Sequence, residues 1–569
     1  MRTRLIRAGV LSAILATFGT QVSISAQAPA RTAGTVQLST LSALQAQGTP
    51  PQAPGTPAPQ IRRLTVDDAV RLAAENNLGI QIARVNPQLE DLNVAQARAN
   101  WTPTFATTVT QNNNESPNSG FLSGSTAASI SDSRFLSNVG VQQTMPWGGG
   151  NYSVGWDTSR RATDNILQSF SPQLQSSMAF SFTQPLMRNF GIDSTRQQLQ
   201  VSEKNREIAD VQLRQSLAST SRTVRNAYWD LAYAIAFLQV QQQTLQLAQQ
   251  SLRDTRARVE IGTTPPIDIV EAEAEVATRD EAVILASAQI ETAQDTLRAL
   301  VFDPSMPDFW TLRIEPSDVA QFRPTAIDVD AAVRNALDRR TDLQQSRKSL
   351  EATDVSVKYL RNQTLPEVTA DFDYGLTGLG GTQLIRGTPP PGQIFGPVVG
   401  QNQRSFGRVL GDVFGNRFPN WSAALTIRYP IGTSPQEASL ARTRLQYSQT
   451  QTQIRNQQLQ IATQVRESAR QAQTNQKRVD TTRVSRELAE RRLDAEQRKF
   501  QAGTSTNFFV FQAQRDLAAA RNNELRAILD YQRSVVDFET VQEVPLSGGS
   551  TAVATAVSGG GNTVPASSR

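Results

Sequence analysis

The chain contains two copies of one pattern. The segment LTVDDAVRLAAENN, which begins at Leu64, aligns with IDVDAAVRNALDRR, which begins at Ile327, an offset of 263 residues. The offset holds without a gap as far as Pro103 and Pro366, where each copy changes to alternating residues. Self-similarity over this distance predicts two tandem structural units. We place them at residues 62–302 and 324–541, with a linker at 303–323.

Each copy contains one helix that is very long for a globular domain. Residues 194–261 contain no proline. An apolar residue recurs there every seven positions, at Leu217, Val224, Leu231, Leu238, Leu245, Leu252 and Val259. A helix of this length is a rod of roughly 100 Å. The second copy repeats the pattern less regularly over about 436–500, with a shift of phase between Ile461 and Val465.

A glycine interrupts each helical pattern. The first copy breaks at Gly262, followed by Thr263, and the heptads resume at Ile269. The second copy breaks at Gly503, followed by Thr504, and a return helix continues to 541. Glycine adopts a left-handed backbone conformation without strain, so we predict that each helix reverses here into a hairpin. The simpler interpretation is that these are turns with no further role.

Composition restricts the possible functions. The 569 residues include no cysteine and no histidine, which excludes a disulfide scaffold and argues against a metal site or a Cys/His enzyme. We therefore expect no enzymatic activity and no cofactor. The net charge of +5 falls to +2 without Arg2, Arg4 and Arg7. Because basic and acidic residues are interleaved along the helices, we do not expect nucleic acid as a partner.

The N-terminal residues predict export. Three arginines precede an apolar run at 8–18, and small residues at 23–26 offer a cleavage site after about Ala26. We expect a signal peptide at 1–26, a disordered Pro/Ala/Gln-rich lead at 27–61 and a disordered tail at 542–569. A short membrane anchor is the alternative, although the run falls short of the ~20 apolar residues that a span needs.

Between the helices, each copy contains segments that alternate with period two. They lie at 104–111, 137–145, 152–158 and 177–184 in the first copy and at 367–377 and 422–429 in the second. Aromatic residues such as Phe105, Trp156 and Trp421 fit the girdles of a membrane β-barrel. A soluble sheet beside the helices is the alternative. We expect an outward-facing loop at 378–420, and an extra hairpin around Trp147 that either joins the barrel or projects from it.

The number of strands predicts an oligomer. Four to six strands per chain cannot close a barrel, and open strand edges are not tolerated in lipid. Three copies would supply about twelve strands or more, enough for closure. The chain is therefore expected to form a homotrimer.

The ordered set of these features resembles the TolC-type outer-membrane efflux proteins over about 64–541. The resemblance rests on the signal peptide, the repeat and the glycine-centred breaks VEIGTTPPIDIVEAEAEV from Val259 and KFQAGTSTNFFVFQAQRDL from Lys499. It also includes the strand segments bounded by Pro103 and Pro185 and by Pro366 and Pro430. It implies an α+β membrane protein, namely a trimeric outer-membrane β-barrel continued across the periplasm by an α-helical coiled-coil barrel.

The resemblance also implies a function. Such a protein is the exit duct of a tripartite efflux pump or of a type I secretion system, located in the outer membrane and extending into the periplasm. Its partners would be outer-membrane lipid, a periplasmic adaptor and an inner-membrane transporter. The adaptor would dock at the turns, at Gly262, Thr263, Gly503 and Thr504. An exported periplasmic coiled-coil scaffold is the alternative, which explains the heptads but neither the signal peptide nor the strands.

The expected periplasmic gate departs from the family pattern. Family members close the mouth with aspartates nine residues past the second glycine or with a hydrophobic ring, and here the ninth residue is Gln512. Phe508 and Phe509 would form the ring instead, closing the mouth by dewetting. In the first copy, Asp268 and Glu271 share a helix face and offer a second, acidic gate. The alternative for Asp268 is an N-terminal helix residue that the helix dipole stabilises. Glu273 and Glu275 are interpreted as a solvated face.

Overall fold

The structure is a computed structural model that describes residues 61–117, 128–318, 322, 324, 326–391 and 395–544. All of these belong to one compact unit that begins at Pro59. The expected signal peptide and nearly all of the expected lead and tail lie outside the described residues. Ile61, assigned to the lead, already belongs to a strand, and Glu543, assigned to the tail, accepts a hydrogen bond from the Thr341 backbone.

The two copies give nearly the same series of helices. The first copy contains α1 (Val66–Asn76), α2 (Leu78–Ala99), α3 (Ser194–Glu260) and α4 (Ile267–Val301). The second contains α5 (Val329–Arg339), α6 (Thr341–Gln363), α8 (Pro435–Gln501) and α9 (Asn507–Val541). The long helices α3 and α8 have 67 residues each, and the return helices α4 and α9 have 35 each. The duplication in the sequence is therefore a duplication of structure.

Local signals begin the two long helices. The Asp193 side chain caps α3 by accepting a hydrogen bond from the Arg196 backbone. Ser434 and Glu437 form a reciprocal capping box at the start of α8. Along α3, the heptad residues Val224 and Leu231 are fully buried. A second heptad series of mostly small buried residues accompanies them at Ala227, Ala234, Gln241, Ala248 and Thr255, which lets a neighbouring helix approach closely.

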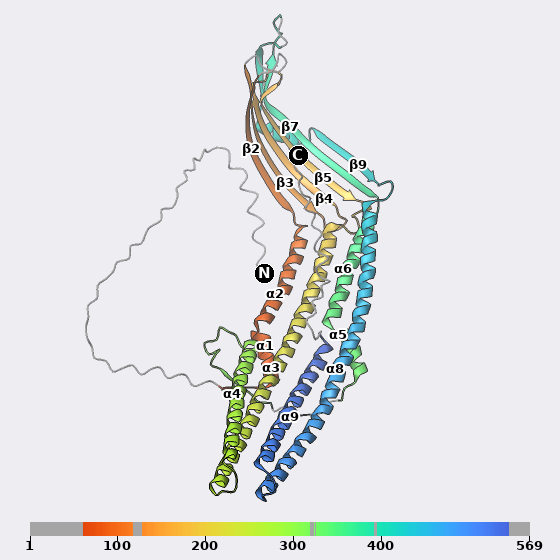
Figure 1. Ribbon diagram of the computed structural model, residues 1–569. Coiled ribbons are helices and arrows are strands. Elements are labelled where there is room, and N and C mark those ends of the chain that lie inside the picture. Colours follow the sequence, from red (N-terminus) through yellow and green to blue (C-terminus); the bar gives the residue numbers. More distant parts are fainter. Residues whose placement is uncertain are drawn as a thin grey trace, which may run out of the picture. The chain divides into compact units, whose positions relative to one another are not determined.

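One sheet lies beyond the C-terminal ends of α2 and α6 (Figure 1). Its strands are β2 (Thr104–Pro117), β3 (Ser129–Thr144), β4 (Asn151–Thr163), β5 (Phe170–Pro185), β7 (Glu367–Arg386), β8 (Val398–Arg404) and β9 (Pro419–Arg428). The order is β2-β3-β4-β5-β7-β8, all antiparallel, and β9 also pairs with β7. Because β9 pairs with residues 367–376 of β7 and β8 with 381–386, these two short strands follow one another along a single edge.

The observed sheet tests two predictions about the strand regions. The extra hairpin around Trp147 joins β3 to β4 inside the sheet and does not project from it. The expected loop at 378–420 was wrong, because β7 continues to Arg386 and is followed by β8 and a short helix, α7 (Phe406–Phe414). Glycines concealed the continuation of β7: a side chain at Gly378 or Gly380 would collide with Val409 of α7. The helix needs these glycines in order to lie on the strand.

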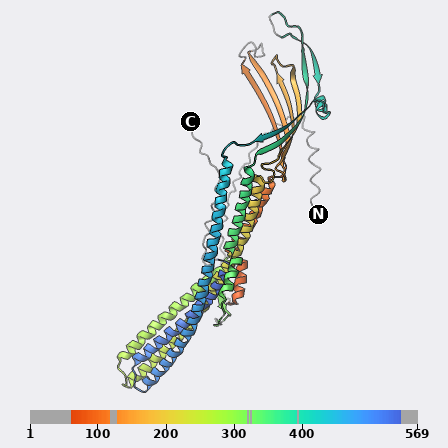
Figure 2. The same ribbon diagram turned by 90° about the vertical axis from the view of Figure 1, so that its right-hand side faces the viewer.

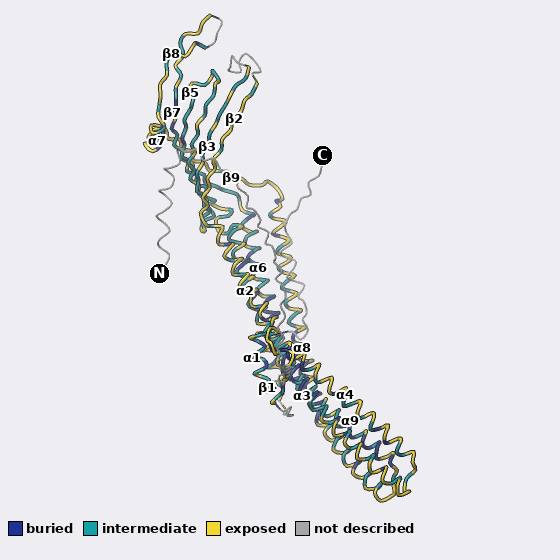
Figure 3. The backbone as a smooth tube through the Cα atoms, turned by 90° about the vertical axis from the view of Figure 1, so that its left-hand side faces the viewer, coloured by how far each residue is buried: buried dark blue, intermediate teal, exposed yellow. Residues whose placement is uncertain are grey.

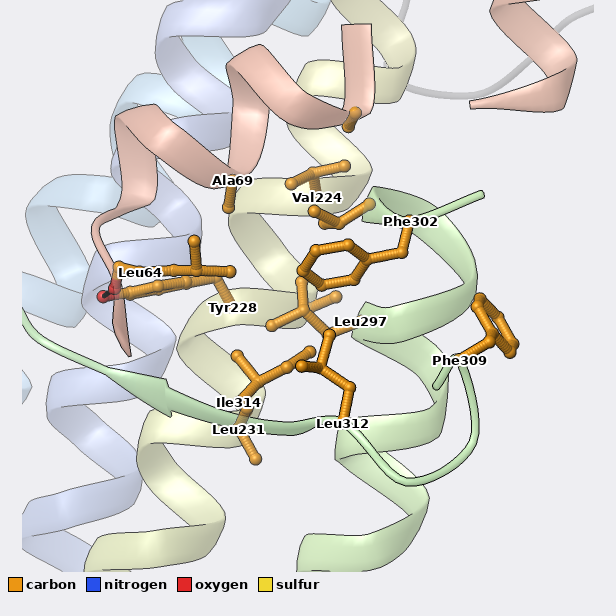
Figure 4. Packing of buried hydrophobic residues seen from close by; sticks show 13 residues of the cluster. Leu64, Ala69, Val224, Tyr228, Leu231, Leu297, Phe302, Phe309, Leu312 and Ile314 are labelled. Atoms are coloured by element: carbon orange, nitrogen blue, oxygen red, sulfur yellow. Dashed lines mark hydrogen bonds between the residues drawn. The ribbon is translucent and has the colours of Figure 1, made fainter. Parts of the chain in front are cut away.

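The expected linker contains a strand that pairs with the start of the first copy. β6 (Arg313–Pro316) pairs in parallel with β1 (Ile61–Leu64). Together they cover a core in which Tyr228 of α3, Leu297 of α4 and Ile314 of β6 are fully buried (Figure 4). The Tyr228 hydroxyl donates a hydrogen bond of 2.9 Å to the Leu64 carbonyl. This core fixes the start of the first copy against the middle of its long helix.

The helices pack in a fixed order. α3 contacts α2 and α6, and α6 contacts α8, in the part nearer the sheet. In the part farther from it, α4 packs on α3, whereas α9 packs on both α3 and α8. The α3–α4 and α8–α9 hairpins lie side by side, with both turns at the end away from the sheet (Figures 1 and 2). Within the described ranges, no helix combines the length and the apolar character needed to cross a membrane.

Candidate functional site at the two helix turns

The turn between α3 and α4 is a Schellman motif. Gly262 has φ +77° and donates a backbone hydrogen bond of 3.0 Å to the Val259 carbonyl. The Thr263 backbone donates one of 2.9 Å to Arg258, and its side-chain hydroxyl reaches the same carbonyl oxygen. These bonds satisfy the last carbonyls of α3 and reverse the chain sharply.

The turn between α8 and α9 repeats this geometry. Gly503 also has φ +77° and bonds to the Phe500 carbonyl at 3.1 Å. Thr504 uses its backbone amide and its hydroxyl to contact the Lys499 carbonyl. Gly262, Thr263, Gly503 and Thr504 therefore occupy equivalent positions in two equivalent caps, although one turn is a residue longer than the other.

Side chains tie the two turns to each other. The Arg258 guanidinium lies 4.1 Å from the centroid of the Phe500 ring and also donates to the Phe500 carbonyl. Buried Asn507 donates a hydrogen bond of 3.1 Å to the Thr255 hydroxyl. Both contacts join α3 to the second hairpin, so the two turns present one continuous end, which is largely exposed (Figure 3).

The exposed end is apolar at both turns. Ile261, Ile267 and Val270 are exposed at the first turn. At the second, Phe508 is 58% exposed and Phe509 is 51% exposed. The two phenyl rings contact each other edge to face, with centroids 5.6 Å apart. Exposed large apolar side chains gathered at one end of a molecule are characteristic of a contact surface.

The other predicted gate residues lie close to these turns. Asp268 is half-buried and Glu271 is exposed, both in the first turns of α4. Among the described residues, neither carboxylate has an ion-pair or hydrogen-bonding partner. Gln512 lies one turn after Phe508 and donates a hydrogen bond of 2.9 Å to Asp516, which pairs with Arg492 of α8. The Gln512 side chain therefore forms its hydrogen bond within the α8–α9 hairpin.

The interpretation of Glu275 as a solvated residue was wrong. Its side chain is only 5% exposed and pairs with Arg279 at 2.7 Å and with Arg515 of α9 at 2.7 Å. Burial raises the pKa of the Glu275 carboxyl, but the hydrogen bonds from Arg515 and Arg279 outweigh burial and hold the pKa below its usual value. Glu273, by contrast, is exposed and pairs with Arg256 on α3.

Sequence reasoning missed the residues that hold the hairpins together. Besides Glu275 and Arg515, these are Arg258, Phe500, Thr255 and Asn507. A signal was present for one of them, because Thr255 stands in the heptad series of small residues, where a polar residue needs a partner. No comparable signal marked Arg515, since its partner lies 240 positions away in the sequence.

The chemistry of this end is that of a contact surface. Within the described residues, no group of three or more His, Cys, Asp or Glu residues could hold a metal ion. A cavity of about 730 Å³ lies elsewhere, between α2 and α3 beside Asp91 and Arg98, far from the turns.

Comparisons with known proteins agree with this geometry. A family model described as outer membrane efflux protein matches residues 69–301 and 332–541, one segment in each copy. Among solved structures, the chain is similar to the outer membrane channel CmeC of Campylobacter jejuni, with a TM-score of 0.59 and 13% identity over 84% of this chain and 85% of that one. A search of curated proteins finds no match.

Two further solved structures share the fold. The outer membrane protein VceC of Vibrio cholerae gives a TM-score of 0.57 at 16% identity, covering 84% of this chain and 96% of that one. The open state of the Neisseria gonorrhoeae MtrE outer membrane channel gives 0.56 at 16% identity, covering 84% and 89%. CmeC and MtrE are both described as outer membrane channels.

The family model covers well over half of the chain, in the two segments that the repeat defines. The expected resemblance to TolC-type proteins and the expected location are therefore confirmed. The chain belongs to the outer membrane efflux protein family and is an exit channel of the outer membrane that extends into the periplasm.

Proposed function

We propose that three copies of this chain form one duct, with a β-barrel in the outer membrane and a helical barrel in the periplasm. The duct would be the exit of a tripartite efflux pump or of a type I secretion system, passing small molecules or proteins. The observation that carries the proposal is the separation of apolar and polar side chains between the two faces of the sheet.

Residues paired across antiparallel strands share a face. One row of paired residues crosses the sheet from β2 to β9 and is apolar throughout: Phe105, Val141, Val154, Phe180, Tyr374 and Trp421. A neighbouring row on the opposite face is polar throughout: Thr104, Gln142, Ser153, Ser181, Asp373 and Ser422. Lipid outside and water inside account for this separation, whereas a soluble scaffold would expose the apolar face to water.

The sheet in one chain has two unpaired outer edges. β2 forms one edge, and β8 with β9 forms the other. In lipid these edges must find partners, and the β2 edge of one copy can pair with the β8/β9 edge of the next. When neighbouring copies close the barrel in this way, both edges gain hydrogen-bonding partners.

The helices carry matching edges. On α2, the exposed residues Leu78, Ile82, Val85, Leu89 and Leu92 form a heptad stripe with no partner helix in the described chain. On the opposite side of the molecule, α8 exposes Leu445 and Leu459, two heptads apart. Farther toward the turns, α4 exposes Leu285 and α8 exposes Val484, at similar distances along the helices from their own turns. Neighbouring copies would bury both pairs of stripes.

The two turns are the proposed contact with the other proteins of the export complex. Gly262, Thr263, Gly503 and Thr504 would present the apolar end to a periplasmic adaptor, which would connect the duct to an inner-membrane transporter. Phe508 and Phe509, with Gln512 nearby, would close the mouth, and Asp268 and Glu271 are the alternative gate. The equivalent caps and the exposed apolar residues around them support this assignment.

Disulfide crosslinking tests the trimer. The chain has no cysteine, so a variant with Leu285→Cys and Val484→Cys carries only the pair under test. Oxidation of this variant in membranes should give a covalent trimer on denaturing gels. Each single-cysteine variant is the matched control and should remain monomeric. A double variant that stays monomeric after oxidation, or that gives only a dimer, would contradict the proposed arrangement.

A further inference from the structure

The helix α7 lies on the apolar face of the sheet. Gly378 and Gly380 of β7 belong to the same face as the apolar row, because they follow Tyr374 at even spacing. Val409 of α7 sits directly over both glycines. Figure 3 shows α7 against the side of the sheet, beside β7. The helix therefore stands on the surface that the proposed barrel turns toward lipid.

Its position along the strands corresponds to the boundary of the membrane. β7 runs away from the helices, and therefore away from the periplasm, from Glu367 to Arg386. The fully apolar row lies at Tyr374, and Trp156 and Leu376 share the next row on that face. α7 covers the rows after these, at Gly378 and Gly380. Aromatic residues followed by polar ones mark the outer interface of a membrane barrel.

The side of α7 that faces the sheet is held firmly. Val409 and Val413 are fully buried against the strands. The nearly buried carboxylate of Asp412 pairs with Arg404 at 2.8 Å and with Arg417 at 3.3 Å. The end of β8 and the segment before β9 are thus tied to the helix, which is a fixed part of the sheet surface.

The side of α7 that faces away from the sheet carries exposed apolar and basic side chains. Phe414 is 68% exposed, and Arg408 is exposed beside Gly407 and Gly411. Arg160 of β4 is exposed on the same face of the sheet, in the row that contains Leu174 and Gly380. Among the described residues, neither Arg160 nor Arg408 pairs with an acidic side chain. An exposed phenyl ring and an unpaired guanidinium group on one helix, with a second unpaired guanidinium group on the same face of the sheet, suit a boundary between acyl chains and anionic headgroups.

We propose that the outward side of α7, with Arg408 and with Arg160 on the same face of the sheet, binds phosphate groups of anionic lipids in the outer leaflet. This inference rests on the proposed function, since it needs the apolar face to meet lipid. Arginine forms bidentate hydrogen bonds with phosphate, and Phe414 inserts among the adjoining acyl chains. Such a site would fix the height of the barrel in the membrane and enrich anionic lipid around it.

Fluorescence quenching in reconstituted bilayers tests the site. The full chain carries one fluorophore, on Phe414→Cys at α7 or on the matched Phe105→Cys, which is 62% exposed within the apolar row. The quencher is phosphatidylglycerol or phosphatidylcholine that bears a nitroxide high on one acyl chain, at equal content in phosphatidylcholine bilayers. At position 414, phosphatidylglycerol should quench more strongly, with a local enrichment on the order of fivefold per arginine. At position 105, the two lipids should quench equally.

Substitutions of the two arginines test whether their charge causes the lipid preference at position 414. Arg160→Gln together with Arg408→Gln should abolish the preference at position 414, as should high salt, whereas Arg408→Lys should retain much of it. Equal quenching of position 414 by both lipids would overturn the inference, and so would quenching at 105 with none at 414. Absence of quenching at both positions would overturn the proposed barrel itself. The two failures are thereby distinguishable.

Discussion

At the scale of single residues, the two turn glycines are required by the backbone and not by packing. Gly262 and Gly503 both have φ +77°, and nothing lies within 4 Å of where a Cβ would stand. Any other residue would fit sterically but would be strained, because the left-handed region costs an L-residue roughly 1–2 kcal/mol. The sequence predicted both positions, since a glycine that ends a heptad pattern is typical of a left-handed helix cap.

Replacing either turn glycine should separate docking from insertion. Gly262→Val or Gly503→Val strains a turn at the exposed end, far from the sheet, so insertion into the outer membrane should remain largely intact. Export measured by drug susceptibility should fall, because the docking surface is distorted. Gly→Asn is the matched control, since Asn tolerates a left-handed backbone better than Val does. If insertion falls as much as export, the turns serve folding instead.

Glu275 shows what the sequence could not predict at this scale. It stands among Glu271 and Glu273 in a run of acidic residues, and only the fold reveals that it alone is buried. Glu275→Gln would leave Arg279, which is 17% exposed, without its anionic partner, and should destabilise the packing of α4 by about 1–3 kcal/mol. Glu273→Gln, which breaks an exposed pair, should cost about 0–1 kcal/mol. Hydrogen exchange along α4 measures both.

The contribution of Glu275 should depend on pH with a defined sign. Its pKa is lowered in the folded protein, so the unfolded state binds the proton more readily. The stabilisation is therefore complete above the unfolded pKa and is lost as the pH falls through the lower folded pKa. Hydrogen exchange of α4 in the parent protein and in Glu275→Gln should differ at neutral pH and converge in acid. A difference that grows toward acid would contradict this assignment.

At the scale of elements, the two return helices have equal lengths but different surroundings. α9 packs between α3 and α8, whereas α4 packs on α3 and leaves its other side exposed. The aromatic pair Phe508–Phe509 begins the more enclosed helix, and Asp268 and Glu271 begin the more exposed one. In the proposed trimer these two helix starts are the competing positions for the gate.

The gate prediction follows from the exposure of Phe508. If three copies bring this side chain together, the closed mouth should conduct poorly and should depend little on divalent cations, because no carboxylate occurs between Gly503 and Asp516. Phe508→Ser should wet the constriction and raise the basal conductance in a planar bilayer. Phe508→Leu is the control and should keep the mouth closed. Unchanged conductance in Phe508→Ser, with a rise in Asp268→Ala or Glu271→Ala, would assign the gate to the first copy.

The elements differ in how far the sequence predicts them. The long helices were predicted closely, α3 within a residue at each end, because heptads and glycine caps are local signals. The second half of β7 was predicted as part of a loop because the glycines that make room for α7 also weaken the pattern of a strand. The pairing of β1 with β6 was not predicted, since each strand has only four residues and the two lie on either side of the first copy in the sequence.

At the scale of the whole molecule, contact surfaces inside the chain and proposed contact surfaces between chains differ in chemistry. Inside the chain, apolar cores are accompanied by ion pairs, such as Arg222–Asp537 and Arg225–Glu539, which join α3 of the first copy to α9 of the second. On the outer sides of α2 and α8 the exposed side chains at heptad spacing are leucine, isoleucine and valine. Apolar stripes without a partner in the described chain indicate surfaces that another copy covers.

A charge exchange tests which stripes face each other. Leu92→Glu places a charge on the exposed stripe of α2 and should prevent assembly, because a carboxylate buried in an apolar seam has no partner. Adding Leu445→Lys on α8 should restore assembly if these residues meet across neighbouring copies. Asn86→Glu, exposed on α2 but outside the stripe, is the control and should assemble normally. Trimer content after detergent extraction measures all three. If Leu445→Lys does not rescue Leu92→Glu, while Leu459→Lys does, the neighbouring copies are displaced along α8 by two heptads from a register in which Leu92 meets Leu445.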